Sequence, residues 1–210
     1  KRFSYRKLSR ENRLTYDVLD YYLELSKKES DYLLYEEPMG TVSGVQTQIP
    51  VLLSEYQFQS KEDVDAYLEL MKTTPDYFNS LIAFEQEKAQ KGLFMASYTA
   101  DTVIEQCQAF IDMGDSNYLI STFVDRIQKL TDLSESEKSD YIQKNAYMLK
   151  TYVLPAYQQL IKTVVELKDS GKNEEGLCYL PNGKEYYELT VQASTGSART
   201  VPQLQKLTKN

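Results

Sequence analysis

The 210-residue sequence contains no histidine, no tryptophan and only two cysteines. Histidine is the usual general base near neutral pH and the commonest protein ligand of zinc, copper and iron. Its absence excludes a Ser-His-Asp triad, a Cys-His pair and an HExxH metal site from this chain. Cys107 and Cys178 do not form a CxxC pair, so they cannot complete a tetrahedral zinc site without carboxylates. We therefore expect no catalytic residue, no metal ligand and no cofactor in these 210 residues.

Long apolar runs and an excess of positive charge are also missing. The longest aliphatic run is about Val51–Leu53, far short of the ~20 apolar residues of a membrane span. Lys and Arg number 24 and Asp and Glu 31, so the net charge is 24 − 31 = −7, which argues against a nucleic-acid partner. With 41% hydrophobic residues, 8 Gly and 6 Pro, the chain is neither disordered nor fibrous. The composition predicts a soluble, compact, acidic protein without a membrane span.

The redox state of the two cysteines is open at this stage. Cys107 falls in a helical pattern and Cys178 in a loop bounded by Gly and Pro. They would form a disulfide in an exported protein and stay as two thiols in a reducing compartment. The sequence cannot set their separation, so both alternatives stand.

Helical periodicity dominates what is present. Ser9 is an expected N-cap, Ser60–Asp63 and Ser134–Glu137 read as capping boxes, and Gly92 is expected to end a helix at positive φ. The predicted helical ranges are 9–35, 60–73, 75–91, 99–112, 117–130, 134–168 and a further helix from 182 or 183. No convincing alternating strand is present. The predicted fold class is all-α, an irregular bundle of seven to nine helices with no substantial sheet, forming a single helical domain over residues 1–210.

Two features interrupt the helical pattern. Residues 37–49 contain Pro38, Gly40 and Gly44 and are predicted to be a loop, followed by a short apolar turn from Pro50 to Tyr56. The glycines of this loop do not follow a strand and match no phosphate-loop motif, so we expect no anion site there. Pro155 lies inside the last long stripe and lacks a backbone donor. It predicts a kink near Thr151 or a helix break.

Few side chains are candidates for chemistry. Glu85 lies on the apolar flank of its helix, where an ion pair with Lys88 at the rim of the core is favoured over catalysis. The doublet Tyr186-Tyr187 has two interpretations. Both rings could line a substrate platform, or one could pack inward while the other covers the surface.

Six segments in the same order along the chain resemble a bacterial family known as domain of unknown function 885. The segments are LSRENRLTYD (8–17), GVQTQIPVLLSEYQF (44–58), DVDAYL (63–68), FEQEKAQKG (84–92), VLPAY (153–157) and LPNGKEYY (180–187). Ordered matches over nearly the whole chain are far more specific than any single one.

The resemblance implies a large, mostly helical protein similar to zinc metallopeptidases, often exported or lipid-anchored in Gram-positive bacteria. The metal site that it implies is a His-Glu-Gly-x-Pro-Gly-His-His segment, which these 210 residues do not contain. We therefore expect an internal fragment, the non-catalytic helical portion of a metal-dependent peptidase or hydrolase-like protein. Zinc and a peptide substrate would belong to the intact protein, at an extracellular or cell-surface location.

The two non-helical breaks suggest where this portion could face a substrate. The candidate cleft residues are Gln46, Gln48, Tyr56, Asn182, Lys184, Tyr186 and Tyr187, although both breaks could merely turn corners between helices. The expected partners are the remainder of the same polypeptide and a second copy of the chain, bound through an exposed apolar face. From a different class, the alternative is a self-sufficient helical module that binds a peptide or glycan through a tyrosine-rich surface.

Overall fold

A computed structural model describes residues 4–172 and 176–209 of the chain. The chain forms two compact units: unit 1 comprises Lys1–Glu36 and Glu175–Asn210, and unit 2 comprises Glu37–Glu174. Helices supply all the regular structure of the described residues, which contain no strand, and the predicted all-α class is confirmed. The prediction that 1–210 is one domain stays a prediction.

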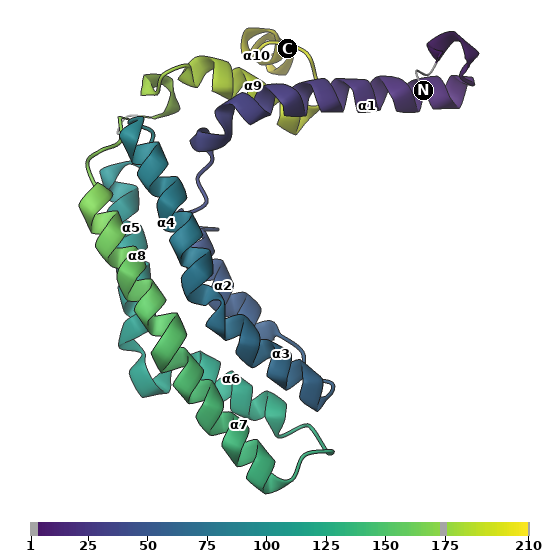
Figure 1. The fold of residues 1–210 in the computed structure, drawn as a ribbon. Helices are drawn as coiled ribbons and strands as arrows, with labels where there is room; N and C mark the ends of the chain where they lie inside the picture. Colours follow the sequence, from purple (N-terminus) through teal and green to yellow (C-terminus); the bar gives the residue numbers. More distant parts are fainter. Residues whose placement is uncertain (1–3, 173–175, 210) are drawn as a thin grey trace. The chain divides into compact units, whose positions relative to one another are not determined.

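Unit 2 is a bundle of antiparallel and crossing helices around one apolar core (Figure 1). Helix α8 lies beside both α4 and α5, and α6 lies beside α7. The ring of Tyr157 on α8 is fully buried, with its centroid 4.9 Å from that of Phe78 and 4.6 Å from that of Phe110. The helices are α2 (Val45–Glu55), α3 (Lys61–Lys72), α4 (Thr74–Gln90), α5 (Ser97–Asp112), α6 (Tyr118–Ile127), α7 (Glu135–Met148) and α8 (Leu154–Leu167).

The ends of these helices follow the signals in the sequence. Ser60 and Asp63 form a capping box at the start of α3, and Ser134 and Glu137 form another at the start of α7. Gly92 follows α4 with φ of +70°, a conformation that residues with a Cβ rarely adopt. These three predictions are confirmed.

The predicted loop over residues 37–49 and the predicted short turn from Pro50 to Tyr56 are wrong from Val45 onward. The structure begins the helix at Val45 and carries it through Pro50 to Glu55. Pro50 has no N–H, so the carbonyl of Gln46, four residues earlier, lacks its usual helical donor. The hydroxyl of Tyr157 on α8 donates to this carbonyl at 2.7 Å. The Tyr157 hydroxyl therefore replaces the backbone N–H donor that Pro50 cannot provide.

Pro155 has a similar effect on the α7–α8 segment. Residues Leu149–Val153 form a π-helical turn between α7 and α8, and Pro155 lies in the first turn of α8. Pro155 has no N–H to donate to the carbonyl of Thr151, four residues earlier. The π-turn allows the chain to continue as a helix despite this missing hydrogen bond. The predicted disturbance near Thr151 is therefore present as a π-turn, and the alternative of a helix break is wrong.

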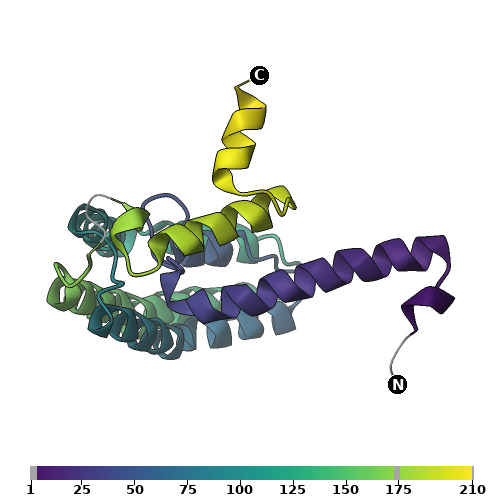
Figure 2. The same ribbon diagram turned by 90° about the horizontal axis from the view of Figure 1, so that it is seen from above.

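Unit 1 is built from α1 (Arg10–Glu29), α9 (Gly183–Thr195) and α10 (Val201–Thr208), with short 3-10 turns η1 (Tyr5–Lys7), η2 (Ser30–Tyr35) and η5 (Leu177–Tyr179). Ser9 accepts a hydrogen bond from the Asn12 backbone and caps α1 as predicted. Helices α1 and α9 lie side by side near the C-terminal end of α1, and the first half of α1 extends past α9 (Figures 1 and 2). Only three hydrophobic side chains of the described part of unit 1 are buried: Leu25, Leu180 and Leu189.

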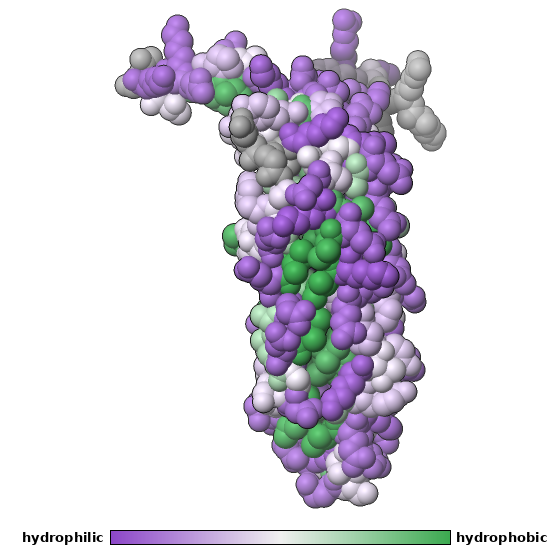
Figure 3. All heavy atoms as spheres, turned by 90° about the vertical axis from the view of Figure 1, so that its left-hand side faces the viewer, coloured by the Kyte–Doolittle hydropathy of each residue, from purple (hydrophilic) through white to green (hydrophobic). Residues whose placement is uncertain are grey.

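Apolar side chains also reach the surface of unit 2. An apolar strip runs along the unit on the side where α5 and α8 lie (Figure 3). Partly buried hydrophobic residues of these two helices that pack against the core include Ile104, Ile111, Leu154 and Ile161. In the part of the chain that the structure describes, no helix is both long and apolar enough to cross a membrane.

Candidate functional site

The turn before α9 brings the η5 turn close to the start of α9. Asn182 is in the left-handed region, with φ of 52°, and the next residue, Gly183, starts α9. A Cβ built on Gly183 would lie 1.8 Å from the carbonyl oxygen of Leu177, so only glycine allows η5 to approach α9 this closely. The Leu180–Gly183 sequence thus positions η5 against the start of α9.

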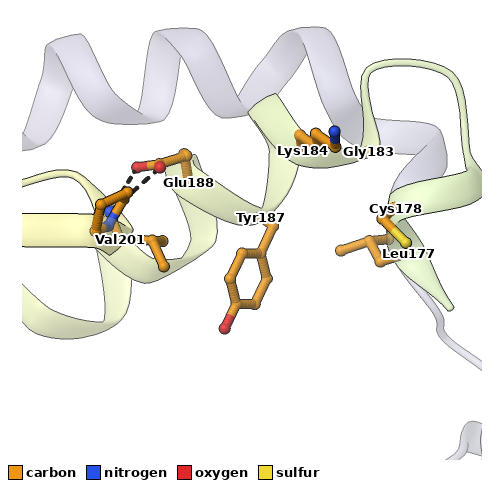
Figure 4. Close-up of a pocket in the computed structure, with 8 residues that line it drawn as sticks. Leu177, Cys178, Gly183, Lys184, Tyr187, Glu188 and Val201 are labelled. Atoms are coloured by element: carbon orange, nitrogen blue, oxygen red, sulfur yellow. Dashed lines mark hydrogen bonds between the residues drawn. The ribbon is translucent and has the colours of Figure 1, made fainter. Parts of the chain in front are cut away.

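A pocket of about 420 Å³ lies beside this turn, between η5, α9 and α10 (Figure 4). The ring of Tyr187 lies between Val201 on one side and Leu177 and Cys178 on the other. The volume is within the usual range for small-ligand pockets. The lining residues are Leu177, Cys178, Gly183, Lys184, Tyr187, Glu188, Val201 and Pro202.

Glu188 holds α10 in place on one side of this pocket. Its two carboxylate oxygens accept hydrogen bonds from the backbone N–H of Val201 at 3.2 and 3.0 Å. Val201 is the first residue of α10, where the exposed N–H groups and the helix dipole favour a negative charge. The Glu188 carboxylate is therefore occupied in holding α10, and the surface that lines the pocket is almost entirely apolar.

The tyrosine doublet divides between packing and exposure. The ring of Tyr186 lies 5.5 Å from that of Tyr32 and 5.0 Å from that of Tyr35, centroid to centroid. The hydroxyl of Tyr35 donates to the carbonyl of Pro181, which ties η2 to the turn, and burial raises the pKa of Tyr35. Tyr187 is half exposed and lines the pocket. The structure thus packs the partly buried ring of Tyr186 against Tyr32 and Tyr35 and places the ring of Tyr187 in the pocket.

Of the seven predicted cleft residues, three belong to unit 2 and do not line this pocket. Gln46 is buried, and its side-chain amide donates to the carbonyl of Gly40 and to Gln106 Oε1. Gln48 is exposed on α2, and the ring of Tyr56 packs 5.7 Å from that of Tyr67. Gln46 and Tyr56 therefore have structural partners. From unit 1, Lys184 and Tyr187 line the pocket, Asn182 shapes its turn, and Tyr186 packs behind it.

Unit 2 contains a buried charge cluster that the sequence placed at the rim of the core. The Nζ atom of Lys88 lies 3.6 Å from the Glu85 carboxylate and 3.5 Å from that of Glu37. Glu85 and Lys88 are 1% and 0% exposed, so the predicted ion pair exists but is buried, and the rim location is wrong. Burial raises the pKa of Glu85 to about 7, with Lys88 lowering it and Glu37 raising it further.

A second pocket, of about 270 Å³, lies in unit 2 and was not predicted. Its lining residues come from α2, α3 and α4, with Thr73 between the last two, and are mostly apolar: Ile49, Leu52, Leu53, Leu70, Thr73, Thr74 and Tyr77. Leu52 and Leu70 lie off the buried stripes of their helices and are exposed. The sequence signal for this pocket was the presence of apolar residues, such as Leu52 and Leu70, outside the buried face of each helix.

Both cysteines are free thiols in the structure. Cys107 is buried on α5, and burial raises its pKa to about 12. Cys178 is exposed and lines the unit 1 pocket. Within residues 4–172 and 176–209, no group of three or more His, Cys, Asp and Glu side chains is arranged to hold a metal ion.

Comparison with known proteins gives a family and a fold. No curated protein matches the chain. A solved structure described as "The crystal structure of the putative lipoprotein from Colwellia psychrerythraea" is 18% identical, with a TM-score of 0.75 over 80% of this chain and 29% of that chain. The chain thus spans less than a third of that relative, and the likeness shows a shared fold. A family model described as "Bacterial protein of unknown function (DUF885)" matches residues 1–210, so the chain belongs to this family.

Proposed function

We propose that this chain is the non-catalytic helical portion of a metal-dependent, hydrolase-like bacterial protein, and that the remainder of the polypeptide packs on unit 1. The observation that carries the proposal is the incomplete burial of unit 1. Among the described residues of unit 1, three hydrophobic side chains are buried and twelve large ones are exposed: Tyr5, Leu14, Tyr16, Val18, Leu19, Tyr21, Tyr22, Leu23, Leu33, Tyr179, Tyr187 and Leu207. Burial of apolar surface is the main stabilising term in folding, and a small unit has little of it to spare.

In this proposal the zinc ligands belong to the remainder of the polypeptide, as the family resemblance implies. The relative of known structure supports this separation of a helical portion from a larger remainder, because the part that matches this chain is 29% of its length. The 210 residues would form a helical wall of the substrate cleft. Their contribution would be to bind and orient a peptide, with the pocket beside Tyr187 receiving an apolar side chain and Lys184 facing a carboxylate or carbonyl of the peptide.

The test is hydrolysis of casein-derived peptides by the whole gene product, with and without a zinc chelator. We expect chelator-sensitive cleavage, and about a tenfold higher KM with little change in kcat for Tyr187→Ala, because the pocket binds substrate without touching the scissile bond. Tyr98→Ala, on the exposed face of α5, is the matched control. A product that cleaves no peptide would overturn the proposed function, and unchanged kinetics in Tyr187→Ala would remove the pocket from it.

The second candidate function is a self-sufficient module that binds a peptide or glycan through its tyrosines. The exposed rings of Tyr179 and Tyr187 in unit 1 favour it, because a tyrosine ring supplies an apolar body with a polar tip. Calorimetry of residues 1–210 alone with chito-oligosaccharides and with casein-derived peptides separates the two. Micromolar binding by the 210 residues would favour the module.

A cell-surface location is part of the proposal. The family resemblance implies export or lipid anchoring, and the description of the relative of known structure as a lipoprotein is compatible with it. Fractionation of the native host, followed by detection with an antibody to residues 1–210, tests the location. Detection only in the cytoplasmic fraction would contradict it.

A further inference from the structure

Two carboxylates of unit 2 share the charge of Lys88. Its Nζ atom lies 3.6 Å from the carboxylate of Glu85, on the same helix, and 3.5 Å from that of Glu37, in the loop before α2. A single positive charge balances only one of two negative charges. The three groups are therefore neutral together while one carboxyl group is protonated, and they carry an excess negative charge when both are ionised.

Glu85 is the carboxyl group that the fold keeps away from water. Its side chain is 1% exposed, and no described residue places a donor within hydrogen-bond distance of either carboxylate oxygen. Burial without donors favours the neutral form of a carboxyl group, and burial is the main cause that raises the pKa of Glu85 to about 7. Glu85 therefore changes its charge between pH 5 and pH 8 at a position that solvent does not reach.

Lys88 and Glu37 are the charged groups that act on Glu85 among the described residues. Helices α3 and α8 and the π-turn Leu149–Val153 lie against α4. Burial raises the pKa of the two phenols that they contribute to the core, so both stay neutral near pH 7. The other described side chains that these elements bury do not titrate. The full set is Val64, Tyr67, Leu68, Met71, Leu149, Val153, Ala156, Tyr157, Leu160, Thr163 and Val164.

Glu37 is the outer end of this cluster and the first residue of its loop. Its side chain is 42% exposed, so it has access to water, whereas Met39, two residues later, is 0% exposed in the core. Farther along the loop, the side-chain amides of Gln46 and Gln106 donate to backbone carbonyls at 2.7 and 2.9 Å. Amides do not titrate, so the pairing of Glu37 with Lys88 is the attachment of the loop that responds to pH.

We propose that Glu85, Lys88 and Glu37 form a pH-sensitive switch that holds the loop Glu37–Gly44 when Glu85 is protonated and releases its start when Glu85 is ionised. In the protonated state Lys88 pairs with Glu37. When Glu85 gives its proton to solvent, Lys88 pairs with the buried carboxylate, which has no access to water, and Glu37 turns outward. The loop then opens more often at Met39. The switch lies within unit 2 and does not depend on the proposed function.

The test measures the oxidation of methionines by hydrogen peroxide in the whole gene product at pH 5 and pH 8, with peptide mass spectrometry as the readout. Oxidation of a thioether to the sulfoxide reports local opening at a buried methionine. We expect Met39 to be oxidised about tenfold faster at pH 8 than at pH 5. Met71 and Met95, 0% and 1% exposed, report opening of the whole unit and should keep their rates. Met113, 38% exposed, gives the rate of an accessible methionine at each pH.

Two variants separate the switch from a general effect of pH. Glu85→Gln stays neutral, so Met39 should be oxidised slowly at both pH values, and Glu37→Gln removes the outer partner, so Met39 should be oxidised rapidly at both. Glu87→Gln, on the exposed face of α4, is the matched control and should keep the wild-type increase. The proposal is overturned if wild-type Met39 reacts equally at the two pH values, or if the increase persists in both Glu85→Gln and Glu37→Gln. An equal increase at the other two buried methionines would also overturn it, because the whole unit would then be opening.

Discussion

The hydroxyl of Tyr157 donates to the backbone carbonyl of Gln46 at 2.7 Å, at the one point in α2 where Pro50 removes the helical donor. Both residues are buried, and 111 positions separate them in the chain. The bond therefore joins α2 to the centre of the unit 2 core. It also explains how a proline is accommodated in the interior of a short helix.

Tyr157→Phe is expected to destabilise unit 2 by about 1–3 kcal/mol, because it leaves a buried carbonyl without a donor while preserving the ring. Urea unfolding followed by circular dichroism measures the change. Tyr77→Phe is the control, since Tyr77 is half exposed on α4. If the two variants are equally stable, the Gln46 carbonyl has another donor and the account of Pro50 fails.

The buried Glu85 predicts a pH dependence with a definite sign. Its pKa rises from an unfolded value of about 4.5 to about 7 in the folded protein, so the folded state binds the proton more tightly. This contribution to stability is fully present below about pH 4.5 and is lost as the pH rises through about 7. Partial desolvation also raises the pKa of Glu37, which adds in the same direction.

Glu85→Gln is expected to gain stability relative to the wild type as the pH rises from 5 to 8, by at most about 3 kcal/mol. Unfolding free energies at four pH values in this range measure the difference. Glu87→Gln, on the exposed face of the same helix, is the matched control and should follow the wild-type profile. A Glu85→Gln profile parallel to that of the wild type would show that the group is already ionised at pH 5.

Gly183→Ala is expected to disrupt the turn that shapes the unit 1 pocket. The new Cβ would lie 1.8 Å from a backbone oxygen, which cannot move away as a side chain can. We expect a loss of about 3 kcal/mol, the upper end for overpacking, and faster proteolysis between residues 176 and 200. Gly40→Ala provides the comparison, because a Cβ there meets nothing within 4 Å. Equal proteolysis rates in the two variants would contradict the pocket geometry.

The two thiols are expected to react very differently. Cys178 is exposed, whereas Cys107 is buried and its pKa is raised to about 12, which leaves little thiolate at neutral pH. A thiol titration should therefore count one reactive group in the native protein and two in urea. No reactive group in urea without reductant would show instead that the cysteines form a disulfide.

Helix ends were predictable where a local signal sets them. The capping boxes at Ser60 and Ser134 need only residues three positions away, and Gly92 needs only its own φ. The start of α2 was not predictable in this way, because Pro50 and the flanking glycines disfavour a helix locally. The donor that compensates comes from Tyr157, more than a hundred residues away.

The candidate site was predictable only in part, for a related reason. The sequence singled out Lys184 and Tyr187 from a turn-rich segment, and both line the pocket. Cys178 and Val201 come from segments whose approach depends on the Gly183 turn and on the Glu188 carboxylate. The burial of the Glu85 side chain likewise depends on contacts with other helices, which the periodicity of its own helix cannot predict.

The measurement that tests the central claim most directly is the zinc content of the whole gene product and of residues 1–210, both after exhaustive dialysis. The account predicts about one zinc ion or more per whole chain and none in the 210 residues, because the proposed function assigns the metal ligands to the remainder of the polypeptide. Stoichiometric zinc in residues 1–210, or none in the whole product, would contradict it.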